Sequence, residues 1–365
     1  MNIYLWDSNA TDLTGKVLAA QLGAKETREK PKNINNGDVV IGWGTKTKEN
    51  ISLSNTAIIL NHPNHIRNAR NKFKTLELLA ANKDTSKTIP KFIAADKIKD
   101  AMKRGTFSFP LIGRTNYHQG GAGLWTVLSA HHLEKALEEG AQYFVEYLPI
   151  DDEYRVHVFK GKVIYVQKKV ENPTEEGWVA QRKEKIEDYA EKNKVKINWD
   201  SVNYALGILA KEAQLLDRIV RSNKRGWKFS HIKIADVPKA LIDAAVKSVE
   251  VIGLDFGAVD CATAGKNPYI IEVNTGPRLQ GGTLEEYVKT FKAFFKDLEK
   301  KPEKKEEPIV PKKAKAPEVL EAVEAVPNSK KVGKIALSKD KLSLLLEAAN
   351  SKEEMKKIIE LIMED

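Results

Sequence analysis

The sequence is poor in cysteine. Cys261 is the single cysteine among 365 residues, which excludes an internal disulfide and fits a protein of the reducing cytoplasm. There is no Cys or His cluster with the spacing of a zinc site. No apolar run is long enough to span a bilayer, and the first residues lack the basic start and apolar stretch of a secretory signal. We therefore expect a cytoplasmic protein without a membrane segment.

Two common catalytic patterns are missing as well. No glycine-rich loop is followed by Gly-Lys-Ser/Thr, so there is no Walker-type phosphate loop. No convincing Ser/His/Asp or Cys/His set is present that would indicate a side-chain nucleophile. Cys261 follows Asp260 in a strand-like run, and strand alternation predicts that it faces the core.

The net charge of +10 is carried by the body of the chain, because the 16 lysines and 15 acidic residues from Lys296 onward nearly cancel. A basic body suits an anionic ligand, which could be a nucleotide, an acidic metabolite or a nucleic acid. Aromatic residues are not interleaved with the basic runs as base-stacking platforms would require, which disfavours nucleic acid.

The pattern of apolar runs predicts an α/β (α+β) fold with a small N-terminal domain over residues 1–65. Short apolar strands are expected at 3–6, 39–41 and 57–60, and helical spacing is expected at 13–22. Alternation of strands with a helix is typical of a parallel sheet.

A second domain is predicted over residues 66–298, and it includes a charged helical insertion at about 171–220. Residues 299–335 are rich in Lys, Glu, Pro and Ala, which predicts a flexible, disordered linker. Apolar spacing returns in 336–365 and predicts a short helical hairpin. This C-terminal extension either docks a protein partner or self-associates, or it is a disordered tail with a marginal helix; both remain open.

Two predicted strands at 253–261 and 269–275 suggest a metal site. A hairpin centred on Lys266 places Asp260 opposite Glu272, and like charges across a ladder destabilise the pair. Asn274 shares the face of Glu272, because side chains alternate with period two. Three oxygen donors on one face suit Mg²⁺, which would remove the repulsion.

The same hairpin has a simpler interpretation, in which these polar residues only face solvent on an edge. In the metal-site interpretation, Ile271 and Val273 point the other way, into the core.

Phosphate-binding groups are suggested by a glycine-rich turn between two strands. The turn contains Gly120, Gly121 and Gly123, whose backbone N–H groups could surround phosphate oxygens. Arg114 and Lys72 are basic groups that could reach the same phosphates. Each of these features also has an ordinary explanation, as a hairpin turn or a solvated charge.

Residues 142–148 form an apolar strand whose end could present backbone groups to adenine, framed by Tyr147 and Leu148. Glu153 follows a short acidic turn and could bind a ribose hydroxyl. The strand itself is also plain core.

Together these segments resemble the ATP-grasp superfamily, and most of all its carboxylate–amine ligases, which include ribosomal-protein glutamate ligases and D-alanine–D-alanine ligase. The resemblance covers about residues 71–282 and rests on the order of its motifs. These are NK at 71–72, FPLIGR at 109–114, QGGAG at 119–123, VEYLPIDDEYRVHVF at 145–159, GLDFGAVD at 253–260 and YIIEVNTGPRL at 269–279. The motifs RSNKRGW and GLDFGAVD are also similar to ATP-grasp proteins encoded in phage genomes.

The resemblance implies an ATP-grasp fold with a preceding small α/β domain, and a role for particular residues. The implied Mg²⁺ ligands, with Mn²⁺ as an alternative ion, are Asp260, Glu272 and Asn274. The implied ATP-binding residues are Lys72, Arg114, Gly120, Gly121, Gly123, Glu146, Tyr147, Leu148, Glu153 and Asn223. The implied catalytic residues, near the transferred phosphate or the substrate carboxylate, are Arg155, Lys168 (or Lys169), Arg221 and Arg278.

Two features depart from the family. Arg114 replaces the commoner lysine, which keeps the charge but turns a point donor into a planar fork. The 171–220 insertion is longer than in the simplest members. Both features affect the prediction of the substrate, and neither affects the prediction that the chain binds ATP.

The implied reaction is ATP- and Mg²⁺-dependent ligation of a small-molecule or peptide carboxylate to an amine through an acyl phosphate. In such a reaction the protein mainly positions groups and neutralises charge. Two alternatives remain open at this stage. One is a kinase of the same fold that phosphorylates a hydroxyl, and the other is a non-catalytic ATP-binding protein.

Overall fold

The computed structural model describes residues 1–9, 13–47, 51–53, 56–117, 123–171, 175–194, 196–200, 202, 221 and 227–300. The chain divides into two compact units. The first holds the described residues of Met1–His118, Gly123–Lys168 and Phe229–Ala325, and it contains three sheets. The second holds those of Lys169–Lys228, including helix α6 (Glu175–Asn193). No helix within these described ranges is both long and apolar enough to cross a membrane.

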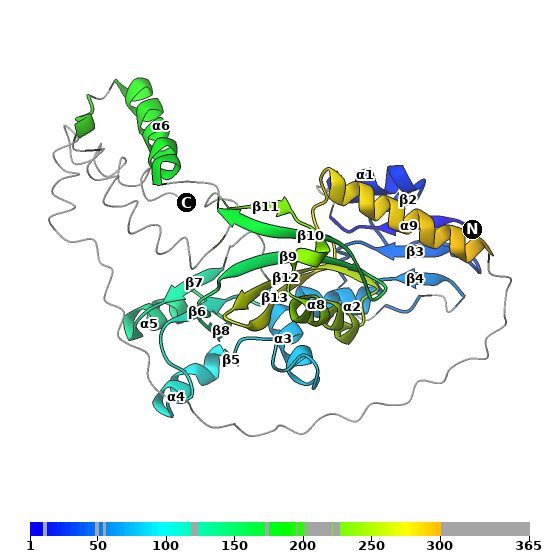
Figure 1. Ribbon diagram of the computed structural model, residues 1–365, viewed down its shortest axis with the longest axis horizontal. Helices are drawn as coiled ribbons and strands as arrows, with labels where there is room; N and C mark the ends of the chain where they lie inside the picture. Colours follow the sequence, from blue (N-terminus) through cyan, green and yellow to red (C-terminus); the bar gives the residue numbers. More distant parts are fainter. Residues whose placement is uncertain are drawn as a thin grey trace. The chain divides into compact units, whose positions relative to one another are not determined.

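The N-terminal sheet is parallel and has the strand order β2-β1-β3-β4. Its strands are β1 (Ile3–Trp6), β2 (Lys25–Thr27), β3 (Val39–Gly42) and β4 (Ile58–Leu60). Helix α1 (Leu13–Leu22) contacts the C-terminal helix α9 (Gly282–Lys300), and the two lie side by side in Figure 1. The expected parallel α/β arrangement is confirmed, although the short strand β2 was not predicted.

The second sheet is antiparallel, in the order β5-β8-β6-β7. Its strands are β5 (Phe92–Ala94), β6 (Leu111–Arg114), β7 (Leu124–Val127) and β8 (Tyr143–Glu146). The helical elements that follow its strands are η1 (Ala95–Lys97), α4 (Ile98–Lys103) and α5 (Ala130–Glu138). Leu111, Val127 and Phe144 are buried in a core shared with these helices.

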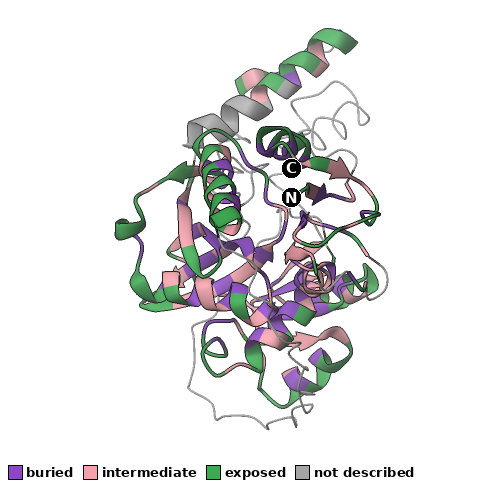
Figure 2. Cartoon of the chain, turned by 90° about the vertical axis from the view of Figure 1, so that its right-hand side faces the viewer, coloured by how far each residue is buried: buried purple, intermediate pink, exposed green. Residues whose placement is uncertain are grey.

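The third sheet has the order β11-β10-β9-β12-β13, and β10, β9, β12 and β13 pair antiparallel. Its strands are β9 (Asp152–Phe159), β10 (Lys162–Glu171), β11 (Trp227–His231), β12 (Phe256–Ala264) and β13 (Asn267–Asn274). Helix α8 (Lys239–Ile252), which follows η3 (Ile234–Asp236), packs on β9, β12 and β13. Figure 2 colours most residues of these central strands as buried or intermediate.

Two helices separated by a break at Asn71 lead from the N-terminal sheet into the second sheet. Helix α2 (Pro63–Arg70) ends at Asn71, which has an extended backbone (φ −80°, ψ 102°). The Asn71 side chain accepts a hydrogen bond from the Lys74 backbone N–H and so caps helix α3 (Lys72–Ala80). The break makes Lys72 the first residue of α3.

An aromatic core joins the N-terminal sheet to the third sheet. Trp43, at the end of β3, is fully buried and stacks on Phe256 of β12 at 5.6 Å between ring centroids. Tyr287 and Phe291 of α9 complete the cluster. Burial of these large rings stabilises the packing of the N-terminal sheet and α9 against the third sheet.

Candidate functional site

One row of polar side chains crosses the third sheet. Register places Gln167 of β10 opposite Arg155 of β9, Arg155 opposite Asp260 of β12, and Asp260 opposite Glu272 of β13. Residues directly opposite in a ladder point to the same face, so the four side chains share one surface. The predicted pairing of Asp260 with Glu272 is therefore confirmed.

A β-bulge in the hairpin corrects one part of the expectation. Toward the turn the register shifts by one residue, so that Cys261 pairs with Ile270. The bulge at Ile271 reverses the alternation. As a result Ile270 is buried, at 1% exposure, whereas Ile271 is only half-buried. Val273 and Cys261 are buried, as expected.

Each carboxylate has a basic partner in the structure. Arg155 donates two hydrogen bonds to Asp260, from Nε to Oδ1 at 2.6 Å and from Nη2 to Oδ2 at 2.8 Å. Lys72 Nζ lies 2.8 Å from Glu272 Oε1. Two buried or half-buried cations therefore already offset part of the repulsion that was expected between the carboxylates, and the metal assignment stays a prediction.

The Arg155 guanidinium is held on a second side by an aromatic ring. Its Cζ lies 4.3 Å from the centroid of Phe229 in β11. Burial alone would lower the pKa of Arg155, but the charge of Asp260 and the hydrogen bonds to it outweigh burial and raise the pKa. Arg155 is thus a permanent, oriented cation at the centre of the row.

The donor set fits a hard divalent cation. Asp260 and Glu272 supply carboxylate oxygens, and Asn274 stands beside them, with its Nδ2 3.4 Å from Asp260 Oδ2. This orientation leaves the Asn274 amide oxygen without a hydrogen-bond partner among the described residues and available to a metal. Mg²⁺ takes few protein oxygens and completes its shell with phosphates and water. The three residues fit that requirement.

The second sheet brings further basic groups near this row. Arg114 ends β6 opposite Tyr143 of β8. Burial raises the pKa of Tyr143. The Arg114 charge lowers this pKa and the Glu272 charge raises it further, so both charges lie close enough to act on the Tyr143 hydroxyl. Arg114 Nε is buried and has no hydrogen-bond partner within the described residues. An orphaned guanidinium N–H is suited to an anionic oxygen.

Of the glycine-rich turn, only Gly123 falls within the described residues; Gly120, Gly121 and the later Asn223 lie outside them. Gly123 has a positive φ of 64°, and an added Cβ would lie 2.5 Å from Thr115 Oγ1. Only glycine fits that position. Arg221 is described within the second unit, where it stacks on Trp227 at 4.7 Å.

The predicted adenine and ribose residues lie on two strands and their connection. Glu146 ends β8 and its Oε1 accepts a hydrogen bond from the Lys91 backbone N–H at 2.8 Å. Tyr147 and Leu148 follow and are half-buried. Glu153 is two residues before Arg155 in β9, shares its face by alternation, and is 6% exposed. Their nucleotide contacts stay predictions.

One predicted catalytic residue, Lys168, points away from the row. Lys168 pairs with Tyr154, so it points to the opposite face from Arg155, and it forms an ion pair with Asp152 at 2.7 Å. Alternation predicts that Lys169, the other candidate, takes the face of Arg155. Arg278 lies exposed in the loop after β13.

A buried relay of hydrogen bonds that was not predicted lies beside the row. His157 of β9 is fully buried, with Nδ1 3.2 Å from the Tyr287 hydroxyl and Nε2 3.3 Å from Gln167 Oε1. Burial first, and then the Arg155 charge, lower the pKa of His157 to about 4, so the ring is neutral at pH 7. No local pattern predicts this relay, because Gln167 and Tyr287 are 120 residues apart in the sequence.

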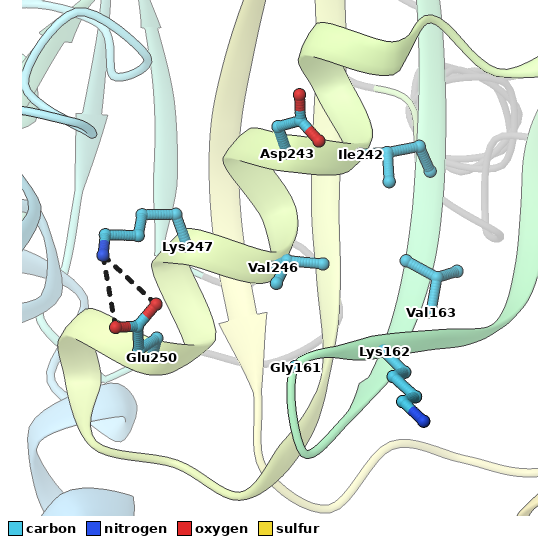
Figure 3. A pocket seen from close by; sticks show the side chains of 8 residues that line it. All are labelled: Gly161, Lys162, Val163, Ile242, Asp243, Val246, Lys247 and Glu250. Carbon is cyan, nitrogen blue, oxygen red and sulfur yellow. Dashed lines mark hydrogen bonds and ion pairs between the residues drawn. The ribbon is translucent and has the colours of Figure 1, made fainter.

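The groove with a volume of about 460 Å³ in Figure 3 is a separate feature. It is lined by residues of the β9–β10 turn, the start of β10 and α8, among them Val163, Val246 and the hydrogen-bonded pair Lys247 and Glu250. Alternation along β12 places Gly257 and Asp260 on opposite faces of the sheet. Helix α8 covers the face of Gly257, because a Cβ added to Gly257 would lie 4.0 Å from Val249 of α8. The groove therefore does not belong to the polar row.

Comparisons with known proteins support the fold. No family model and no curated protein matches the sequence. Among solved structures, D-alanine–D-alanine ligase from Bacillus anthracis matches with 14% identity and a TM-score of 0.51, covering 82% of this chain and 95% of that one. The same ligase in complex with ATP matches with 15% identity and a TM-score of 0.50, covering 81% and 98%.

The described chain thus has the fold of D-alanine–D-alanine ligase, which is the ATP-grasp fold expected from the sequence. At this level of identity the likeness establishes the fold alone. The activity has to be argued from the residues of the site.

Proposed function

We propose that this protein is an ATP- and Mg²⁺-dependent ligase that joins a carboxylate to an amine through an acyl phosphate. The observation that carries the proposal is the row Arg155–Asp260–Glu272, with Lys72 and Asn274 beside it. Cations and hard oxygen donors alternate there within a few ångströms, which suits a polyphosphate with a bound divalent ion.

The charge of each residue would determine its role. Asp260, Glu272 and Asn274 would hold Mg²⁺, which supplies Lewis-acid neutralisation of phosphate charge when bound. Lys72 and Arg155 would turn from the carboxylates toward phosphate oxygens, and the unpartnered Nε of Arg114 would donate to another. Each cation stays buried or half-buried, so its charge is felt strongly by a bound anion.

The reaction follows from this arrangement. An oxygen of the substrate carboxylate attacks the γ-phosphorus, the bond to the ADP oxygen breaks, and an acyl phosphate forms. An amine then attacks the acyl carbon and releases inorganic phosphate, with one proton lost from nitrogen. In this proposal Arg155 would stabilise the charge that develops on the transferred group. No side-chain nucleophile is needed. The only cysteine, Cys261, is fully buried and its pKa is raised by burial.

The acid and the amine are proposed to be small molecules or peptides, in a cytoplasmic setting that supplies ATP. The test uses purified protein, ATP, Mg²⁺ or Mn²⁺, and pools of amino acids and short peptides. ADP and phosphate formation that requires both an acid and an amine, with a product of the summed mass less water, supports ligation. Phosphorylation of a hydroxyl without release of phosphate would instead identify a kinase.

Charge-neutral variants test the metal ligands. Asp260→Asn and Glu272→Gln should each reduce turnover to background while the circular dichroism spectrum is retained, because each removes one anionic ligand. Asp243→Asn on the exposed side of α8 is the matched control and should behave as wild type. Wild-type rates in Asp260→Asn or Glu272→Gln would refute the metal assignment.

A further inference from the structure

Gln167 occupies the end of the polar row, beyond Arg155 as seen from the carboxylates. Strands in a sheet lie about 4.8 Å apart, so Gln167 is about 5 Å from Arg155 and about 10 Å from Asp260 in the strand-to-strand direction. Under the proposed function, Mg²⁺ is held at the carboxylates and Arg155 is beside the transferred phosphoryl group. Gln167 is the next side chain along the row and is therefore within reach of that group.

The orientation of the Gln167 amide follows from counting hydrogens in the buried relay. The Tyr287 hydroxyl is fully buried, and within the described residues its hydrogen-bond partner is His157 Nδ1. The hydroxyl hydrogen is satisfied only if Tyr287 donates to an unprotonated Nδ1. The neutral ring then carries its hydrogen on Nε2 and donates it to Gln167 Oε1.

The reverse arrangement fails. If the Gln167 amide nitrogen donated to His157 Nε2, then Nδ1 would carry the hydrogen and donate to Tyr287. The Tyr287 hydroxyl hydrogen would be left buried with no acceptor among the described residues, which costs about 1–3 kcal/mol. The relay therefore holds the Gln167 amide oxygen toward His157. The NH₂ group has no hydrogen-bond partner in the described part of the chain and lies on the face of Arg155.

We propose that Gln167 donates a hydrogen bond to an oxygen of the phosphoryl group during its transfer to the acid, and that His157 and Tyr287 are positioning residues for this amide. The assignment rests on the proposed function, since it needs a nucleotide at the carboxylate end of the row. It adds a neutral donor beside the Arg155 cation, directed at an oxyanion.

The test measures binding of inorganic phosphate to the complex of the full-length protein with ADP and Mg²⁺ by calorimetry. Gln167→Met keeps the shape of the side chain and removes the donor. We expect its Kd for phosphate to rise about tenfold, because a hydrogen bond to a charged group is lost. The Kd for ADP–Mg²⁺ should stay within about twofold. Gln21→Met, on the exposed face of α1, is the matched control.

Several outcomes overturn the assignment. These are an unchanged phosphate Kd in Gln167→Met, an equal loss of ADP–Mg²⁺ and phosphate affinity, and a wild-type ADP complex that binds no phosphate at about 50 mM. Failure of the wild-type protein to bind ADP–Mg²⁺ at all would be a different result, and it would refute the proposed function.

The relay has a readout of its own that needs no nucleotide. Nitrogen-15 NMR of histidine-labelled protein, with His157→Gln to assign the signal, reports which ring nitrogen carries hydrogen. We expect the Nε2–H tautomer in wild type, and a Nδ1–H tautomer would overturn the argument. Tyr287→Phe should allow both tautomers and raise the phosphate Kd severalfold, whereas a purely structural role would leave the tautomer unchanged.

Discussion

Asn61 joins the N-terminal sheet to the third sheet and offers a sharp test of how the two are held together. It is fully buried directly after β4. Its Oδ1 accepts hydrogen bonds from the backbone N–H groups of Asp255 and Phe256, at 2.8 and 3.1 Å, and its Nδ2 donates to the Phe256 carbonyl at 2.9 Å. One amide therefore satisfies three backbone groups at the start of β12.

Asn61→Leu keeps the volume and removes all three hydrogen bonds. Each buried backbone group left unpaired costs about 1–3 kcal/mol, so three such groups cost about 3 kcal/mol when the lower value is used for each. Asn61 also has a left-handed backbone with φ 57°, which adds about 1 kcal/mol for leucine. We expect the free energy of unfolding to fall by about 4 kcal/mol, measured by urea unfolding followed through tryptophan fluorescence.

The chain supplies a matched control for the backbone term. Asn33 has φ 58° but is exposed, so Asn33→Leu should cost only about 1 kcal/mol. The difference of about 3 kcal/mol between the two variants isolates the hydrogen bonds of the Asn61 side chain, and corresponds to a shift in urea midpoint of about 1 M. Equal losses in Asn33→Leu and Asn61→Leu would show that the amide does not join the sheets.

Three further predictions follow from the site. The pKa of His157 is about 4 in the folded protein and near 6.5 when unfolded, so the unfolded state binds more protons between these values. The free energy of unfolding should therefore fall by about 3 kcal/mol from pH 6.5 to 4, a loss absent from His157→Gln; parallel pH curves would contradict this. Lys168→Met should keep kcat within about threefold, while Arg155→Met should lower it at least about 100-fold; the opposite ranking would return Lys168 to the site. Gly276→Ala should lower the free energy of unfolding by about 2 kcal/mol, since its Cβ would lie 2.9 Å from Gly44 N; an unchanged free energy of unfolding would contradict the close approach of the two loops.

Much of the third sheet could be predicted because its information is local. Asp260 and Glu272 flank a short turn, so hairpin geometry and period-two alternation suffice to place them opposite each other. The predicted parallel strands of the N-terminal sheet rest on the same kind of short-range pattern. The bulge at Ile271 was not predictable, because shifting the register by one residue leaves no mark in composition.

The domain boundaries and the ATP-binding and catalytic roles stay predictions. Register nevertheless disfavours one residue that resemblance suggested. Lys168 and Lys169 are indistinguishable as neighbouring lysines in a sequence, but pairing with Tyr154 places Lys168 on the opposite face from Arg155. A single-residue difference in a strand reverses the direction of the side chain.

The sequence by itself determined the local elements and the pair of carboxylates at the β12–β13 hairpin, since these depend on residues within a few positions of one another. Only the tertiary structure decided which cations neutralise that pair. Lys72 is 200 residues from Glu272, and Arg155 is 105 residues from Asp260. The Tyr287–His157–Gln167 relay likewise forms only when β9, β10 and α9 meet. Contacts at such separations depend on chain topology, which no local pattern of residues encodes.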